Sequence, residues 1–230
     1  MDIEFTDITY RYPGTEAEVF HHLTGRITGP GFHALFGPSG VGKTTLARLI
    51  AGRGAGYGGE IRMRGIADIL YCYNTERLPG WSAIGDHLLA VTPADRRDRL
   101  DALVTAFGLR DYLSARYAQL SMGQRNRANL TRYLVQDFDL LIMDESLANV
   151  DEATRQRIIL AMKATFPDRL FLYISHNVAE VAQFCREILV LRGVRRRPQL
   201  TRIDGRDGAD GDPPDRDGLE RTMLEIVHAA

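Results

Sequence analysis

The chain has 230 residues, of which 44% are hydrophobic and 26% charged, and its formal net charge is −1. These values are ordinary for a globular protein and exclude the basic composition typical of nucleic-acid-binding domains, so we expect no nucleic-acid partner. Two cysteines exclude a disulfide framework, and no run approaches the roughly 20 apolar residues of a membrane-spanning helix. With no signal-peptide pattern at the start, the cytosol is the expected compartment, and any membrane-spanning part is expected in other polypeptides.

The N-terminal region predicts strands that lead into a glycine-rich loop. Residues 3–10 alternate apolar and polar side chains, which favours a strand at a sheet edge, and 19–27 predicts a second strand. The apolar run 32–36 is typical of a buried strand. Residues 37–44 read Gly-Pro-Ser-Gly-Val-Gly-Lys-Thr, which matches the phosphate-loop pattern G-x-x-x-x-G-K-[ST], and a helical pattern follows.

This loop has the chemistry of a nucleoside triphosphate site. Glycines let the backbone curl so that successive N–H groups point inward, and the start of the helix adds its positive end. Lys43 supplies a charge to the outer phosphates, and the Thr44 hydroxyl is a candidate Mg²⁺ ligand. The expected contacts to the nucleotide are Gly37, Pro38, Ser39, Gly40, Val41, Gly42, Lys43, Thr44 and Thr45.

Between about 76 and 135 the pattern changes from strands to helices. Thr92 and Pro93 are interpreted as an N-cap and first helical residue, and Gly108 as the end of that helix. We therefore predict a helical subdomain inserted into an α/β core.

Strands and helices alternate again from residue 140. Strands are expected at 140–143, 170–174 and 188–191, with helices at 152–166 and 178–185. This order predicts an α/β fold: a P-loop NTPase core with a mostly parallel sheet, an antiparallel β edge and the inserted helical subdomain. We predict one domain over 1–203, followed by a flexible acidic tail over 204–230 with a possible short helix.

Two carboxylates follow the apolar strand at 140–143. Asp144, at the carboxyl end of a strand beside the phosphate loop, is placed to hold Mg²⁺ through water or Thr44. Glu145 is placed to polarise a water for attack on the γ-phosphate. We therefore interpret the pair as catalytic.

A further motif lies upstream, where Leu120-Ser121-Met122-Gly123-Gln124 precedes a helical run. Ser121 and Gln124 have capping-box spacing, which by itself indicates only a helix start. Twenty residues before an Asp-Glu strand end, however, the motif resembles the L-S-G-G-Q signature of ATP-binding-cassette (ABC) ATPases.

The resemblance spans about 3–192 and implies roles for residues that match the family's motifs. It implies that Tyr12 stacks on adenine, that Glu145 is the catalytic glutamate, and that His176 contacts the γ-phosphate. It implies that 148–151 form the D-loop at a dimer interface. It also implies that the signature turn of a second subunit contacts ATP through Ser121, Gly123 and Gln124.

Three departures from the family pattern bear on activity. Asn74 stands where the family has the metal-sensing glutamine of the Q-loop, with the same amide on a shorter side chain. Met122 replaces a glycine of the signature, and Asn149 and Val150 replace the usual Ala-Leu of the D-loop. The candidate catalytic residues Lys43, Glu145 and His176 match the family, so we expect ATP hydrolysis. The expected metal residues are Thr44, Asn74 and Asp144.

Two further segments lie outside the residues expected at the nucleotide site. Residues 76–81 resemble a segment of importer ATPases for nitrate, sulfonates and taurine, and predict either a hydrophobic contact point at Trp81 or a cap on the subdomain core. The basic run 192–197 is interpreted as a solvated exit from the last strand, with contact to a membrane surface or a partner as the alternative.

The resemblance therefore implies an ATP-binding and ATP-hydrolysing subunit of an ABC transporter, with ATP and Mg²⁺ as cofactors. A second such subunit, expected as a homodimer, and integral-membrane permease subunits are the implied partners, and the implied location is peripheral on the inner face of the cell membrane. The alternatives are a non-transport ABC ATPase and a regulatory ATP-binding module with weakened hydrolysis. A GTPase is disfavoured because no N-K-x-D guanine-reading stretch is present.

Overall fold

In the computed structural model the phosphate loop follows β3, an inner strand of the larger of two sheets. Residues 1–74, 76, 80–212 and 215–230 are described, and among them this sheet has six strands in the order β5-β6-β7-β3-β8-β9. The first five strands in this order pair in parallel, and β8 and β9 pair antiparallel. The bounds are β3 (Gly31–Phe36), β5 (Ile69–Tyr73), β6 (Leu140–Asp144), β7 (Leu170–Ile174), β8 (Glu187–Leu191) and β9 (Leu200–Asp204).

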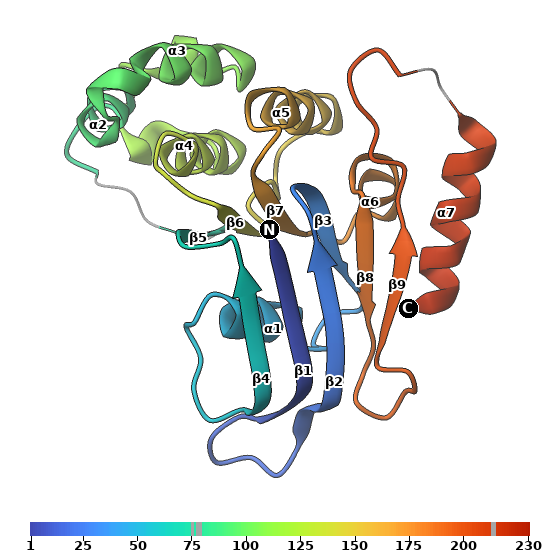
Figure 1. The fold of residues 1–230 in the computed structure, drawn as a ribbon. Coiled ribbons are helices and arrows are strands. Elements are labelled where there is room, and N and C mark those ends of the chain that lie inside the picture. Colours follow the sequence, from blue (N-terminus) through green and yellow to red (C-terminus); the bar gives the residue numbers. More distant parts are fainter. Residues whose placement is uncertain (75, 77–79, 213–214) are drawn as a thin grey trace.

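A second, antiparallel sheet lies beside it in the order β2-β1-β4 (Figure 1). Its strands are β1 (Asp2–Arg11), β2 (Glu18–Thr28) and β4 (Gly58–Arg64). The prediction that 3–10 is an edge strand was wrong, because β1 is the middle strand of this sheet. Alternating hydrophobicity reports that one face of a strand is buried and carries no information on its neighbours.

The core has two layers separated by the six-stranded sheet. Along β6, Leu141 and Met143 pack into one hydrophobic cluster, whereas Leu140 and Ile142 pack into the other. The first cluster receives the buried residues of α3 to α6, and the second receives those of α1, β1 and β2. Because both faces are covered, the strands read as continuous apolar runs, as the sequence predicted.

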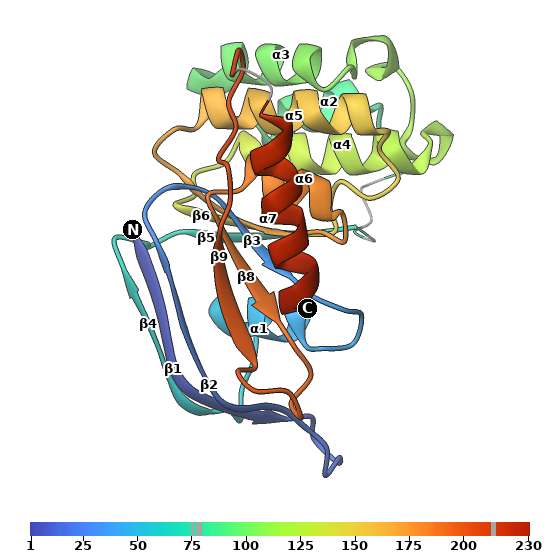
Figure 2. The same ribbon diagram turned by 90° about the vertical axis from the view of Figure 1, so that its right-hand side faces the viewer.

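Helices α2 to α6 lie on the side of the six-stranded sheet away from the antiparallel strands, whereas α1 lies on the same side as those strands (Figure 1). The view turned by 90° shows α7 running along the outside of α6 and β8 (Figure 2). The bounds are α1 (Lys43–Ile50), α2 (Ile84–Val91), α3 (Arg97–Ala106), α4 (Met122–Leu134), α5 (Glu152–Thr165), α6 (Val178–Phe184) and α7 (Arg216–Ala229), with 3₁₀ turns at Ala94–Arg96, Arg110–Tyr112 and Tyr117–Gln119.

The predicted N-cap at Thr92 was wrong. Thr92 ends α2, where its hydroxyl donates to the Leu88 carbonyl at 2.6 Å, and Pro93 precedes a 3₁₀ turn. A threonine hydroxyl bonds equally well to a carbonyl one turn back or to an N–H ahead. The sequence at 92–93 therefore fits both assignments, and the contacts of α2 decide between them.

The tail differs from the expected flexible segment. The amides of Gly205 and Arg206 donate to the carbonyls of Arg186 at 2.9 Å and Ala182 at 3.0 Å, and Lys163 Nζ donates to the Gly208 carbonyl at 2.8 Å. The helix α7 then buries Ile226. These backbone contacts do not depend on side-chain type, so a composition of Asp, Gly and Arg does not reveal them.

Candidate functional site

The phosphate loop connects β3 to α1 and needs glycine for steric reasons. Gly37 has φ +144°, and a Cβ there would lie 2.2 Å from the Leu191 carbonyl oxygen on β8. Gly42 has φ +104°, and a Cβ there would lie 2.6 Å from Val19. Only a residue without a side chain fits this path, which keeps the backbone N–H groups free to face an anion.

Lys43 folds back over this loop. Its Nζ donates to the Gly37 carbonyl at 2.7 Å and to the Pro38 carbonyl at 2.8 Å. Burial lowers the pKa of Lys43, against the opposing negative charges of Glu145 and Asp144. The amine is therefore fixed within the loop, where phosphate oxygens would replace carbonyl oxygens as its partners.

Asp144 ends β6 beside the first turn of α1. Thr44 Oγ1 donates to its Oδ1 at 3.2 Å, and the Tyr71 hydroxyl donates to its Oδ2 at 2.7 Å. A largely buried carboxylate and a hydroxyl are hard oxygen donors of the kind Mg²⁺ prefers. Thr44 and Asp144 therefore fit a magnesium ion.

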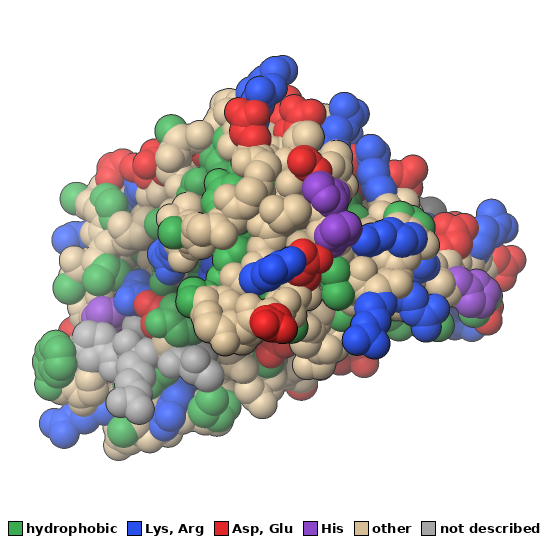
Figure 3. Space-filling view, turned by 90° about the horizontal axis from the view of Figure 1, so that it is seen from below, with side chains coloured by type: hydrophobic (Ala, Val, Ile, Leu, Met, Phe, Trp, Pro, Cys, Tyr) green, Lys and Arg blue, Asp and Glu red, His purple; other side chains and the backbone are tan. Residues whose placement is uncertain are grey.

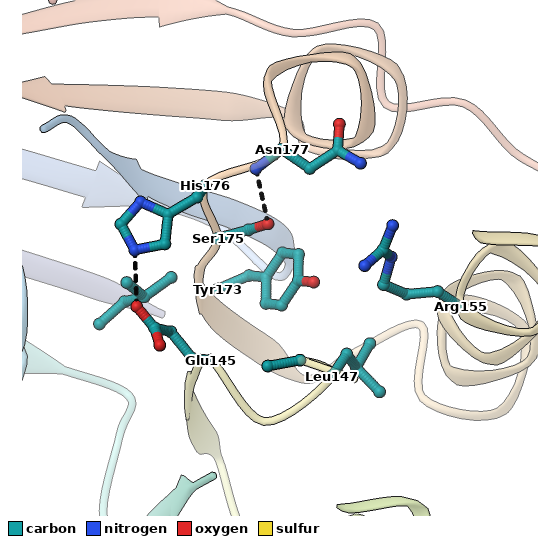
Figure 4. Close-up of a pocket in the computed structure, with 9 residues that line it drawn as sticks. Glu145, Leu147, Arg155, Tyr173, Ser175, His176 and Asn177 are labelled. Atoms are coloured by element: carbon teal, nitrogen blue, oxygen red, sulfur yellow. Dashed lines mark hydrogen bonds and ion pairs between the residues drawn. The ribbon is translucent and has the colours of Figure 1, made fainter. Parts of the chain in front are cut away.

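Glu145 and His176 meet because β6 and β7 pair in parallel. The register places Asp144 opposite Ile174, so the residues that follow each strand lie side by side. His176 Nε2 is hydrogen-bonded to Glu145 Oε1 at 2.6 Å, and both border a pocket of about 340 Å³ (Figure 4). Glu145 has φ 52°, a left-handed conformation that a glutamate rarely adopts and that tertiary contacts must hold.

Glu180 of α6 fixes the loop that carries His176. This buried carboxylate accepts from the Ser175 hydroxyl at 3.0 Å and from the Tyr173 hydroxyl at 2.7 Å, and forms an ion pair with Arg155 of α5 at 2.5 Å. Figure 4 shows Arg155 across from Glu145 and His176, with Ser175 and Tyr173 between them. The ion pair links α5, which follows the predicted D-loop, to the His176 loop.

The predicted adenine-stacking residue lies next to the phosphate loop. The hydroxyl of Tyr12, in the turn after β1, is hydrogen-bonded to Thr45 Oγ1 of α1. The Tyr12 ring remains 48% exposed, so one aromatic surface is available to a planar base.

The signature residues form a separate, exposed feature at the start of α4. Ser121 is the N-cap: Gln124 N donates to its Oγ at 3.3 Å, and Ser121 N donates to Gln124 Oε1 at 2.7 Å, which confirms the predicted capping box. Met122 is 46% exposed. A Cβ on Gly123 would lie 2.4 Å from the Asn149 carbonyl, so the D-loop packs closely on this turn. Among the described residues, no hydrogen bond joins this turn to 37–45.

Asn74 follows β5 and faces α4. Its Oδ1 accepts from Asn126 Nδ2 at 2.9 Å, and the same amide of Asn126 also donates to the Ala148 carbonyl of the D-loop. The hydrophobic contact point predicted at 76–81 falls partly on 77–79, which lie outside the described residues. Trp81, at the end of 76–81, is 82% exposed.

The basic run 192–197 has one residue with a clear structural contact. Arg192 donates to the last carbonyls of α7, those of His228 and Ala229, so it neutralises the negative end of that helix. Arg195, Arg196 and Arg197 are exposed. The surface seen from below carries both acidic and basic side chains (Figure 3).

Sequence reasoning missed Tyr71, Asn126 and Glu180. Tyr71 and Glu180 carry no motif and acquire their partners only when β5, β6 and α6 come together. Asn126 had a detectable signal, because it lies at the spacing of Leu130 and Leu134 on the buried face of α4, where a polar side chain requires a partner.

Comparison with known proteins identifies the family. A family model described as ABC transporter matches residues 20–148, more than half of the chain. The chain belongs to the ABC transporter family. The match includes the phosphate loop, the signature turn, and the Asp144–Glu145 pair.

Individual ABC proteins agree with this assignment. The aliphatic sulfonates import ATP-binding protein SsuB of Cupriavidus necator is 31% identical over 199 residues, which cover 82% of this chain and 65% of SsuB. The molybdenum import ATP-binding protein ModC of Saccharophagus degradans is 34% identical over 180 residues, covering 70% of this chain and 50% of ModC. The chain thus spans about half to two thirds of these relatives.

The fold matches that of solved ABC proteins. The structure of a bacterial Atm1-family ABC exporter with ATP bound aligns with a TM-score of 0.75 at 21% identity, covering 99% of this chain and 41% of the exporter chain. This likeness confirms the predicted fold class, an α/β core with a largely parallel sheet and an added helical part.

Proposed function

We propose that this chain binds and hydrolyses ATP with Mg²⁺ and that it drives solute movement through a separate membrane permease. The names of SsuB and ModC support the ATP-binding and import parts of this proposal. Within the described part of the chain, none of the helices has the length and apolar character needed to cross a membrane. The proposed location is peripheral, on the inner face of the cell membrane.

The observation that carries the proposal is the hydrogen bond between Glu145 and His176 beside the Thr44–Asp144 pair. Lys43 would place its charge on the outer phosphates, and Thr44 and Asp144 would hold Mg²⁺, with Asn74 as an additional oxygen donor. Bound magnesium neutralises charge on the phosphate oxygens. Glu145 would orient a water and take its proton, and His176 would hold Glu145 in position.

A second copy of the chain is proposed to complete the site. The Ser121 turn is exposed, its cap already stabilises α4 internally, and the D-loop packs against it. In a head-to-tail homodimer, Ser121, Gly123 and Gln124 of each copy would face the phosphate loop of the other. Completing the site only on dimer closure would couple ATP binding to movement.

The test of hydrolysis is Glu145→Gln, which keeps the size and removes the carboxylate. We expect phosphate release to fall by about a hundredfold or more, the usual contribution of a general base, with ATP binding retained. The matched control is Glu152→Gln, an exposed glutamate in the first turn of α5. Phosphate release that is equal in the wild type and Glu145→Gln and well above the protein-free background would show that Glu145 is not the base.

The occupied amide of Asn74 favours a second candidate, a regulatory ATP-binding module with weakened hydrolysis. In that case the wild type would bind ATP in the same assay but release no more phosphate than Glu145→Gln.

A further inference from the structure

Asn126 of α4 holds two segments of the proposed site with one buried amide. The residue is 4% exposed, and its Nδ2 donates to Asn74 Oδ1 at 2.9 Å and to the Ala148 carbonyl. An amide nitrogen has two hydrogens, so both are used. The contact to Ala148 and the packing of α4 fix Asn126 in place whatever Asn74 does.

The hydrogen bond from Asn126 directs the side-chain oxygen of Asn74 towards α4. This oxygen is the atom that Asn74 would offer to a metal, because carbonyl oxygens are Mg²⁺ ligands and amide nitrogens are not. The hydrogen bond is neutral and therefore of ordinary strength. It is weak enough to be exchanged for a metal contact and strong enough to matter for affinity.

A stronger anchor lies two residues further along. The carboxylate of Glu76 accepts from the Tyr133 hydroxyl at 2.7 Å and from Asn129 Nδ2 at 3.2 Å, and it is ion-paired with Arg132. The Glu76 carbonyl also accepts from the Tyr117 hydroxyl at 2.9 Å. Charged and multiple contacts exceed one neutral hydrogen bond, so Glu76 keeps the chain on α4 while Asn74 is free to exchange its partner.

We propose that Asn126 is a positioning residue that competes with Mg²⁺–nucleotide for the side-chain oxygen of Asn74. The inference rests on the proposed role of Asn74 at the magnesium site. Asn126 holds Asn74 in a resting position when the site is empty and loses this contact when magnesium binds.

The test measures Mg²⁺ affinity by calorimetry, with MgCl₂ titrated into protein saturated with the non-hydrolysable analogue AMP-PNP. Asn126→Ala removes the competitor, so we expect magnesium to bind about three- to tenfold more tightly, as for the loss of one neutral hydrogen bond. In an Asn74→Ala background the same substitution should have no effect. The matched control is Asn129→Ala, an equally buried asparagine one turn along α4 that contacts Glu76 and not Asn74.

Each outcome decides the proposal. Unchanged or weaker binding in Asn126→Ala overturns it, and so does a gain that persists without Asn74, since the effect would then pass through Ala148. If Asn126→Ala fails to fold, Asn126→Ser keeps a polar side chain at this buried position, is too short to hold Asn74, and is expected to give the same gain. A wild type whose AMP-PNP complex binds no magnesium would overturn the proposed function as well, whereas normal wild-type binding with no gain in the variants overturns this inference alone.

Discussion

The two ends of the proposed site are built in opposite ways. At the phosphate loop, Lys43 and Asp144 are buried, their polar atoms are paired within the chain, and glycines hold positive φ angles. At the start of α4, Ser121 and Met122 are exposed, and the hydrogen bonds of the turn are local to it. The first region is arranged to hold an anion by itself, whereas the second presents a finished helix end outward.

This difference indicates how the work is divided between them. Preorganised donors in a buried loop give affinity and electrostatic stabilisation without a second chain. An exposed helix end with its cap in place can approach a partner without refolding. Changes in the phosphate loop should therefore affect one subunit, and changes at Ser121 should affect only an assembled pair.

The largest expected effect comes from Lys43→Ala. It removes the charge held in the loop, and we expect ATP hydrolysis to fall by about a hundredfold or more, with weaker ATP binding as well. Phosphate release and nucleotide titration measure the two effects. The chain has only two lysines, so Lys163→Ala is the matched control: Lys163 fastens the tail to α6 and its loss should lower stability alone. Similar ATP affinity in both variants would show that Lys43 and the phosphate loop do not bind ATP.

An intermediate effect is expected from Ser121→Ala. Loss of the N-cap should cost about 1 kcal/mol of stability, and loss of the partner contact should lower turnover by about tenfold, the low end for one hydrogen bond to a charged group. ATP affinity of the dilute protein should not change. The control is Asp215→Ala, which removes the N-cap of α7 far from the signature turn. If both variants lose turnover equally, the effect is one of stability and the proposed contact is wrong.

The smallest expected effect is the pH dependence of folding stability that comes from β3, the buried strand before the phosphate loop. His33 of β3 is fully buried, its Nε2 bonds to the Gly29 carbonyl at 3.1 Å, and burial lowers its pKa more than the nearby Glu187 raises it. As pH falls below about 6.5, the unfolded chain therefore binds more protons than the folded chain. Folding stability should decrease on acidification for this reason.

Urea unfolding at pH 7 and pH 5 measures this dependence. His33→Gln should reduce the loss of stability between the two, because the group that must accept a proton is gone. His22→Gln serves as the control, since His22 is exposed and paired with Asp7. An unchanged pH dependence in His33→Gln would show that His33 does not control it.

Much of the phosphate-loop region could be predicted because its chemistry is local. The sequence from Gly37 to Thr45 contains the turn, the charge and the hydroxyl in one stretch, and the apolar strands on either side follow from their composition. The path of the tail could not be predicted, because 205–208 are held by backbone bonds to 182–186, in α6 and the turn after it. Thr92 was misassigned because its hydroxyl serves either of two helices equally well.

The sequence by itself determined the family, the phosphate loop, the Asp144–Glu145 pair and the cap at Ser121, because each is encoded by neighbouring residues whose spacing has one physical use. Only the tertiary structure decided that Glu145 meets His176, that Tyr71 bonds to Asp144, and that Asn126 holds Asn74 and the D-loop together. These contacts join residues about 20 to 70 positions apart. Their partners are selected by strand register and helix packing, which no local pattern records.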